Sequence, residues 1–261
     1  MGEDPNVSSG TQVVEPDAGF KFWSAFRRQW RQSVAHYGLV RTSRETLAAL
    51  GRAVLELTPS RRRARYGDLD YDLEQLVDTT RANVSFRTQL MAALAGNPYF
   101  ATDPWLFEQM MNALPIRFQE FTFIDLGSGK GRALLLAAKH GFQRVIGVEF
   151  MPELHRAAEE NIRTFVVKFR LPAQVQSLCM DALDFKFPAG PLVVYLFNPF
   201  PEPVLAAVLN NLRQSWERTP RPVYVAYRYL EVEHLLAGSN WLEKVAGTQQ
   251  WAVYKNRRDR A

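Results

Sequence analysis

The 261-residue chain has few of the residues that form covalent or metal cross-links. It has one cysteine, Cys179, so no disulfide can form within the chain. Its four histidines are scattered, and none stands at metal-ligand spacing from another ligand, which argues against a structural zinc site. The apolar run from Leu192 to Phe197 is far shorter than the roughly 20 residues that a membrane span needs. The polar, acidic start MGEDPNVSSG is unlike a secretory signal, so we expect a soluble, cytoplasmic protein.

Charge is unevenly placed along the chain. Residues 20–65 hold 11 Lys and Arg against 2 Asp and Glu, whereas residues 66–120 hold 3 against 8. One interpretation is that a basic helical face packs beside an acidic one. The other is that the basic segment forms a surface for an anionic partner. The charge pattern alone leaves both open.

The first 120 residues are expected to be mostly helical. Residues 1–19 lack periodicity and are predicted to be a disordered tail. From Phe20, apolar residues recur every three or four positions, which predicts a helix with one apolar stripe: Trp23, Phe26, Trp30, Val34 and Tyr37. Further helices are expected over 44–57, 73–95 and 105–114, with a loop over 97–104 and a basic linker or patch at 61–65. Residues 20–120 are thus predicted to be a helical N-terminal extension that acts in acceptor recognition or as a lid.

The pattern changes at residue 121, where short apolar segments begin to alternate with helical ones. Strands are expected over 121–126, 144–150, 175–183, 191–197 and 222–230, and two shorter, antiparallel strands over 241–246 and 250–255. This alternation predicts an α/β fold: a doubly wound, mostly parallel seven-stranded sheet with helices on both faces. Residues 121–255 are therefore expected to form the catalytic domain, followed by a basic tail over 256–261.

A glycine-rich loop follows the first expected strand. Its sequence is DLGSGKGR, residues 125–132. The spacing fits neither the phosphate loop of nucleotide triphosphatases nor the G-x-G-x-x-G dinucleotide fingerprint. Asp125 would repel a diphosphate, whereas it would attract a ligand with a cationic amino-acid head. Such a ligand is expected to lie over the loop, beyond the carboxyl ends of the strands.

The loop, together with Val148-Glu149 at the end of the next strand, resembles the motif pair of class I, seven-strand S-adenosylmethionine (SAM) methyltransferases. The Asp-Leu-Gly-Ser-Gly form most resembles bacterial proteins similar to the non-SET histone-lysine methyltransferases. The resemblance implies that the loop backbone cradles the methionyl part of SAM, that Asp125 lies near its ammonium group and that Glu149 accepts the ribose hydroxyls. Asp181 and Ala182 would read the adenine, although a turn aspartate is the alternative, and Phe150 would pack on the ring or in the core. The implied cofactor residues in the domain are Asp125, Gly127, Ser128, Gly129, Gly131, Glu149, Phe150, Asp181 and Ala182.

Two further segments are candidates for the site. Asn198-Pro199-Phe200-Pro201 follows the fourth expected strand and is similar to the [Asn/Asp]-Pro-Pro-aromatic motif of methyltransferases that act on adenine amines or glutamine amides. Asn198 and the Pro199 carbonyl would accept the acceptor's N–H groups, with Phe200 as a wall and Asn198 touching the edge of SAM. The order of the motif differs here, which puts planar acceptors in doubt. Upstream, Tyr99 and Thr102 are candidates for a segment that folds over SAM.

These patterns predict a SAM-dependent methyltransferase whose acceptor is a nitrogen atom, with protein lysine as the first choice. A small-molecule methyltransferase with the extension as a lid is the alternative. A non-catalytic module of the same fold, docking on RNA or another anionic partner, is a third reading, and nucleic acid is not the favoured partner. Lys130 and Arg132 are poor candidates for a general base and are expected to face solvent or a carboxylate.

Overall fold

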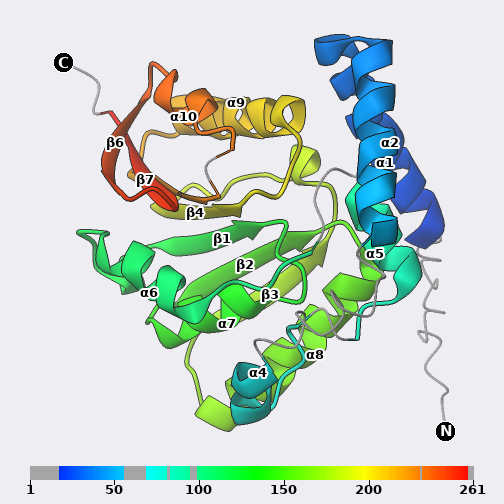
Figure 1. Cartoon of the computed structure of the whole chain (residues 1–261). Coiled ribbons are helices and arrows are strands. Elements are labelled where there is room, and N and C mark those ends of the chain that lie inside the picture. Colours follow the sequence, from blue (N-terminus) through cyan, green and yellow to red (C-terminus); the bar gives the residue numbers. More distant parts are fainter. Residues whose placement is uncertain (1–17, 56–68, 81–82, 95–98, 230, 258–261) are drawn as a thin grey trace, which may run out of the picture.

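The computed structural model describes residues 18–55, 69–80, 83–94, 99–229 and 231–257 (Figure 1). The basic run at 61–65 and most of the two expected tails lie outside this range. Within it, the first helix begins at Ala18, two residues inside the tail expected over 1–19. No helix of the described part is long and apolar enough to cross a membrane. The described residues also contain no cluster of three or more His, Cys, Asp or Glu suited to hold a metal ion.

Seven strands form one sheet in the order β3-β2-β1-β4-β5-β7-β6. The β1, β2, β3, β4 and β5 strands pair in parallel, and β7 pairs antiparallel with both β5 and β6. The strands are β1 (Thr122–Leu126), β2 (Arg144–Glu149), β3 (Gln174–Cys179), β4 (Leu192–Phe197), β5 (Val223–Arg228), β6 (Leu242–Gly247) and β7 (Trp251–Asn256). The predicted α/β, mostly parallel seven-stranded fold is confirmed.

Helices cover both faces of the sheet (Figure 1). On one face lie α6 (Pro104–Asn112), α7 (Arg132–Lys139) and α8 (Pro152–Phe169). On the other lie α9 (Glu202–Arg218) and α10 (His234–Ala237), together with the short 3-10 helix η2 (Ala182–Asp184). A second 3-10 turn, η1 (Phe118–Glu120), leads into β1. Each face has its own apolar core because alternate residues of a strand point to opposite faces.

The N-terminal helices lie across one end of the sheet. Figure 1 shows α1 (Ala18–Tyr37) and α2 (Leu39–Leu55) beside each other, at the end toward which the strand arrows of β1, β2 and β3 point. The α1 helix also contacts α9, and α2 contacts α5 (Phe86–Leu94). The α1 and α2 helices therefore lie over the carboxyl ends of the strands, where open α/β sheets bind their ligands.

Two of the expected N-terminal helices have different bounds. The α2 helix begins at Leu39 rather than at residue 44, because Gly38, with φ of 79°, turns the chain directly from α1 into α2. The single helix expected over 73–95 is two helices, α4 (Leu69–Gln75) and α5. Leu76 adopts a left-handed φ of 58° and ends α4. The Asp72 carboxylate then accepts the backbone N–H groups of Thr79 and Thr80, at 2.7 and 2.8 Å, in place of a continued helix.

The α6 face offers a test of this core. Phe107 is 1% exposed and packs edge-on against Phe123 and Tyr195, with ring centroids 5.8 and 5.7 Å away. Phe107→Ala should lower the free energy of unfolding by about 3–5 kcal/mol, through lost burial and the cavity left behind. Trp105→Ala on the same helix is the control: that side chain is 66% exposed, so the change should stay within about 0.5 kcal/mol. Urea unfolding measures both, and equal losses would contradict the core assignment.

Candidate functional site

The glycine loop lies against the end of β2. The backbone N–H groups of Gly127 and Ser128 both donate to the Val148 carbonyl, at 2.8 and 3.1 Å. Gly127, Gly129 and Gly131 have positive φ angles of 84°, 54° and 86°, a region that residues with a Cβ rarely adopt. The loop thus turns sharply from β1 into α7, for which Gly131 is the N-terminal cap.

Two predicted site segments come into contact with this loop. A Cβ built on Gly127 would lie 2.6 Å from the Pro199 Cβ, and a Cβ on Gly129 would lie 2.1 Å from Cε2 of Tyr99. The turn over residues 198–201, which the sequence suggests for the acceptor and which is called the acceptor turn below, and Tyr99 therefore both approach a backbone that has no side chains at these positions. The structure thus brings together Pro199, Tyr99 and the glycine loop.

Two carboxylates are buried beside the loop. Glu149 is 5% exposed and accepts the N–H groups of Gly129 and Met151, each at 2.8 Å. Burial nevertheless raises the pKa of Glu149 to about 7. Asp125 is 4% exposed, and burial, followed by the charge of Glu149, raises its pKa well above the usual value. Among the described residues, no side chain or backbone donor hydrogen-bonds to the Asp125 carboxylate.

An unpaired buried carboxylate is costly, and a cationic ligand group would offset that cost. The Ser128 hydroxyl, also buried, likewise has no partner in the described part of the chain. These unsatisfied groups fit the amino-acid end of SAM. The Gly129–Glu149 hydrogen bond also fixes the Glu149 carboxylate next to the loop.

Asp181 is engaged by two groups of the protein. Its Oδ1 accepts the Leu183 N–H at 2.9 Å and caps η2, the turn role that the sequence left open. Its Oδ2 pairs with Nη2 of Arg28 on α1 at 2.5 Å. Arg28 also binds both oxygens of Asp184, at 2.9 and 2.7 Å, and this hydrogen bonding lowers the pKa of Asp184. No sequence pattern indicated that Arg28 would pair with Asp181. Ala182, which follows Asp181, is buried in the core.

Aromatic side chains from three segments gather near the end of β2. Phe150 is partly buried and packs with Tyr99 and with Phe26 of α1 against a small core that contains Met151. Phe150 is therefore placed between the extension and the domain. The Thr102 hydroxyl lies 3.3 Å from the Tyr195 hydroxyl, so the two are bonded to each other, and Thr102 is buried.

The acceptor turn is strained at its first residue. Asn198 has a φ of 41°, in the left-handed region, and non-glycine residues in that region gather at functional sites. Its Nδ2 donates to Glu231 at 3.2 Å. Phe200 is 6% exposed and packs in the core under α9, which favours a supporting role for this ring. Beyond the turn, Glu202 accepts from the Tyr37 hydroxyl at 2.6 Å and lies 2.8 Å from Nε2 of His234.

Lys130 and Arg132 both face carboxylates and not solvent. Lys130, 2% exposed, pairs with Asp78 at 2.8 Å, and Arg132, 1% exposed, pairs with Asp72 at 3.2 Å. These partners were missed from the sequence. The available signal was a cation on each side of Gly131, just before the apolar segment 133–138, together with the excess of acids over 66–120.

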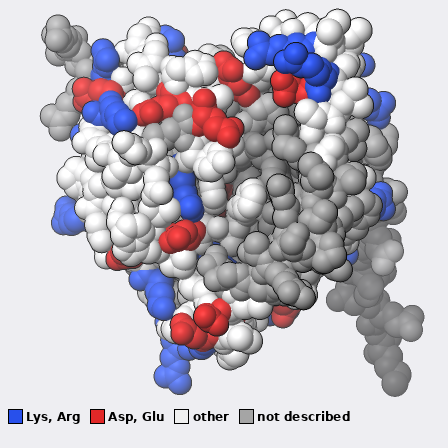
Figure 2. Space-filling model, viewed as in Figure 1, with Lys and Arg blue, Asp and Glu red and all other residues white. Residues whose placement is uncertain are grey.

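The ion pairs that involve Arg28, Asp72 and Asp78 do not join the basic segment 20–65 to the acidic segment 66–120. Arg28 pairs with η2, while Asp72 and Asp78 pair with the glycine-loop region. Figure 2 shows a basic patch over the α1–α2 layer and acidic side chains gathered beside it along the same face. A groove of about 510 Å³ on α1 is lined by Ser24, Arg27, Arg28, Arg31, Gln32 and Ala35.

Residues 123–217 match the family model described as a methyltransferase domain. No curated protein sequence matches the chain. Among solved structures, the chain is similar to an RNA methyltransferase from Salinibacter ruber in complex with S-adenosyl-L-homocysteine (19% identity, 60% of this chain and 92% of that chain, TM-score 0.42). It is also similar to magnesium protoporphyrin IX methyltransferase from Synechocystis with bound SAM (11%, 58% and 75%, 0.41). A third is a ribosomal protein L11 methylase from Lactobacillus delbrueckii subsp. bulgaricus (18%, 59% and 77%, 0.39).

The raised pKa of Glu149 predicts a pH-dependent stability. In the unfolded chain this group ionises near pH 4.5, whereas in the fold it stays protonated up to about pH 7. Its contribution to stability is therefore present below pH 4.5 and lost as the pH rises to 7, by up to roughly 3 kcal/mol. Glu149→Gln should flatten this decline in urea unfolding of the ligand-free protein. Glu160→Gln, at an exposed position, is the control, and an unchanged slope in Glu149→Gln would contradict the assignment.

Proposed function

We propose that this chain, whose residues 123–217 match a methyltransferase domain, transfers a methyl group from SAM to a nitrogen atom, namely the side-chain amine of a protein lysine. The observation that carries the proposal is the contact between Gly127 and Pro199. It sets the acceptor turn directly against the loop that would hold the methyl donor. Residues 121–255 are then the catalytic domain, and residues 20–120 shape the acceptor side.

The residues around the loop would divide the cofactor between them. Asp125 would take the ammonium group of SAM, the Gly127–Gly131 backbone its methionyl part and Glu149 its ribose. SAM supplies an already activated methyl group on a sulfonium, so the protein's main task is to orient the nucleophile in line with it. No side chain has to act as a strong base in this arrangement.

The surroundings of Asn198 favour a cationic acceptor. Glu231 hydrogen-bonds to the Asn198 amide, and Glu202 lies at the start of α9, just after the same turn. Carboxylates at this entrance would attract a lysine ammonium and accept its hydrogen bonds. The amine must then lose a proton before transfer, which the partly apolar environment of Pro199 and the buried Phe200 would favour. In this proposal the Asn198 side-chain oxygen and the Pro199 carbonyl would accept the remaining N–H bonds.

Support for lysine over other acceptors comes from these charges and from the loop sequence. The narrower resemblance to non-SET histone-lysine methyltransferases rests on the loop sequence alone. A small-molecule acceptor is the second candidate, favoured by the position of α1. Arg28 and Tyr37 join this helix to η2 and to α9, so α1 would act as a lid over a small substrate. The non-catalytic reading is set aside because of the methyltransferase domain match.

The test of the acceptor is transfer of labelled methyl groups from SAM in cell extract with the purified full chain. Label released as methyl-lysine after acid hydrolysis of the protein fraction is the expected result. Label in nucleic acid, or in small molecules only, would overturn the lysine acceptor while keeping the methyltransferase. No label in any fraction, with no binding of SAM by calorimetry, would overturn both.

Asn198→Ala should separate catalysis from cofactor binding. The side chain is proposed to touch the acceptor, with at most an edge contact to SAM. The affinity for SAM should therefore stay within a few-fold, whereas the turnover rate should fall by about 10²-fold or more, because a misaligned nucleophile loses its orientation. Calorimetry and a steady-state methyl-transfer assay measure the two. Equal losses of affinity and turnover would move Asn198 to the cofactor site.

Arg28→Ala should show whether α1 covers the cofactor. Without the Arg28 contacts to Asp181 and Asp184, the helix loses its anchor at η2. Association and dissociation of S-adenosylhomocysteine should both become several-fold faster, with a smaller change in Kd. Stopped-flow binding measures the rates. Arg163→Ala is the matched control, because it removes an exposed ion pair with Glu160 on α8. Rates equal to those of the unmodified chain in both variants would exclude a lid at this position.

A further inference from the structure

A buried polar network supports the glycine loop, and most of its members are not among the site residues predicted from the sequence. Arg132, the first residue of α7, is 1% exposed, and its guanidinium lies at a helix N-terminus, where a positive charge is unfavourable. Its partners come from the segment upstream of the sheet. Nε donates to the Thr79 hydroxyl at 2.6 Å, Nη2 pairs with Asp72 at 3.2 Å and the guanidinium lies 4.6 Å from the Tyr71 ring centroid.

Asp72 organises the turn that follows α4. Besides Arg132, it accepts the Thr79 hydroxyl at 2.5 Å and the backbone N–H groups of Thr79 and Thr80. Asp72 is 5% exposed, so the guanidinium and the carboxylate are both desolvated. Buried ion pairs contribute little net stability, and one well-supported reason to keep them is that they specify a single arrangement. The arrangement specified here is that of the turn over residues 76–80.

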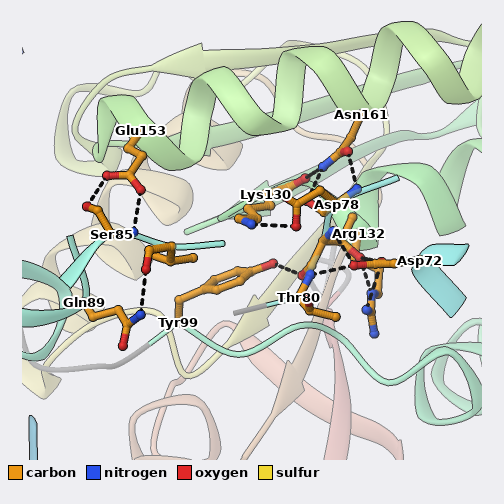
Figure 3. Close-up of polar contacts among 12 residues, drawn as sticks. Asp72, Asp78, Thr80, Ser85, Gln89, Tyr99, Lys130, Arg132, Glu153 and Asn161 are labelled. Atoms are coloured by element: carbon orange, nitrogen blue, oxygen red, sulfur yellow. Dashed lines mark hydrogen bonds and ion pairs between the residues drawn. The ribbon is translucent and has the colours of Figure 1, made fainter. Parts of the chain in front are cut away.

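This turn holds Tyr99 on the loop. The Tyr99 hydroxyl donates to the Thr79 carbonyl at 2.6 Å, and its ring lies where a side chain on Gly129 would be. A second arm fixes the neighbouring loop residue. Lys130 pairs with Asp78, and the Asn161 amide on α8 donates to the carbonyls of Asp78 and Lys130 at 2.8 and 3.0 Å. Figure 3 shows Tyr99 and Lys130 converging on these partners, with Asp72 and Arg132 on one side.

We infer that Thr79, Asp72 and Arg132 are positioning residues for cofactor binding: together they hold Tyr99 and the glycine loop in the arrangement that takes SAM. The inference rests on the proposed function for the identity of the ligand. Its physical reason is that the Gly129 N–H donates to Glu149 at 2.8 Å, so any shift of the loop also moves the group proposed for the ribose. The turn that carries Asp72 and Thr79, and Tyr99 beside it, thereby support the cofactor site.

The chain offers a matched pair of substitutions to test this. Thr79→Val keeps the shape but removes the hydroxyl between Arg132 and Asp72. Thr88→Val removes a similar buried hydroxyl, 6% exposed, which donates to Glu153 of α8 at 2.5 Å. In Figure 3 the Glu153 cluster lies on the opposite side of Tyr99 from Asp72 and Arg132. Both changes remove a hydrogen bond between the upstream segment and the domain, but only Thr79 contacts the loop network.

Calorimetry with SAM and with S-adenosylhomocysteine, together with hydrogen exchange of residues 127–131, is carried out on the full chain and its variants. Thr79→Val should weaken binding of both ligands by about 10-fold or more and speed exchange in the loop. Thr79→Ser, which keeps the hydroxyl, and Thr88→Val should stay within about 3-fold for binding and leave exchange unchanged, even if Tm falls. Equal effects of Thr79→Val and Thr88→Val would overturn the inference.

If the unmodified chain binds neither ligand, the proposed cofactor fails. Hydrogen exchange then decides the positioning role by itself: faster exchange over 127–131 in Thr79→Val alone supports it, and unchanged exchange overturns it. The two failures are therefore distinguishable.

Discussion

The site depends on one glycine loop that three other parts of the chain contact, two of them more closely than a side chain on the loop would permit. The three glycines of the loop meet three different neighbours: Gly127 with Pro199, Gly129 with Tyr99 and Gly131 with Ala158. Pro199 belongs to the turn after β4, Tyr99 to the segment upstream of the sheet and Ala158 to α8. A Cβ at Gly131 would lie 3.2 Å from the Ala158 Cβ, tight but not impossible, whereas the other two contacts leave no room. The acceptor turn, the extension and the domain are thus joined at a stretch of five residues.

Charges around this loop are treated in two opposite ways. The cations Lys130 and Arg132 are buried and fully paired by aspartates of the upstream segment. Asp125 is buried with no hydrogen bond to its carboxyl group from the described residues, and burial, followed by the charge of Glu149, raises its pKa well above the usual value. Because desolvation penalises an unpaired charge, the first arrangement fixes structure and the second leaves a place for a ligand cation. The paired cations of the loop region thus serve its structure, whereas the Asp125 carboxyl group is available for a ligand.

Much of the fold follows from local sequence patterns, whereas the contacts that define the site do not. The strands and helices of residues 121–255 can be recognised from the spacing of apolar residues within each segment. The glycine loop can be recognised from its three closely spaced glycines. The break after α4 was missed because Asp72 binds Thr79 and Thr80 in place of continuing a helix, a choice that depends on Arg132, 60 residues away. The Arg28–Asp181 pair spans 153 residues, and no helix or strand period indicates it. Phe200 looked like a wall residue beside two prolines, yet its apolar ring is buried under α9.

The α1 helix connects two parts of the domain that lie apart in the sequence. Its 20 residues form a rod of about 30 Å, anchored through Arg28 at η2 and through Tyr37 at α9. A stiff element held at two points transmits a displacement from one point to the other. Ligands that contacted α1 at both of these points would be thermodynamically linked, and the linkage would be equal in both directions. In this way α1 would couple binding near η2 to binding near the start of α9.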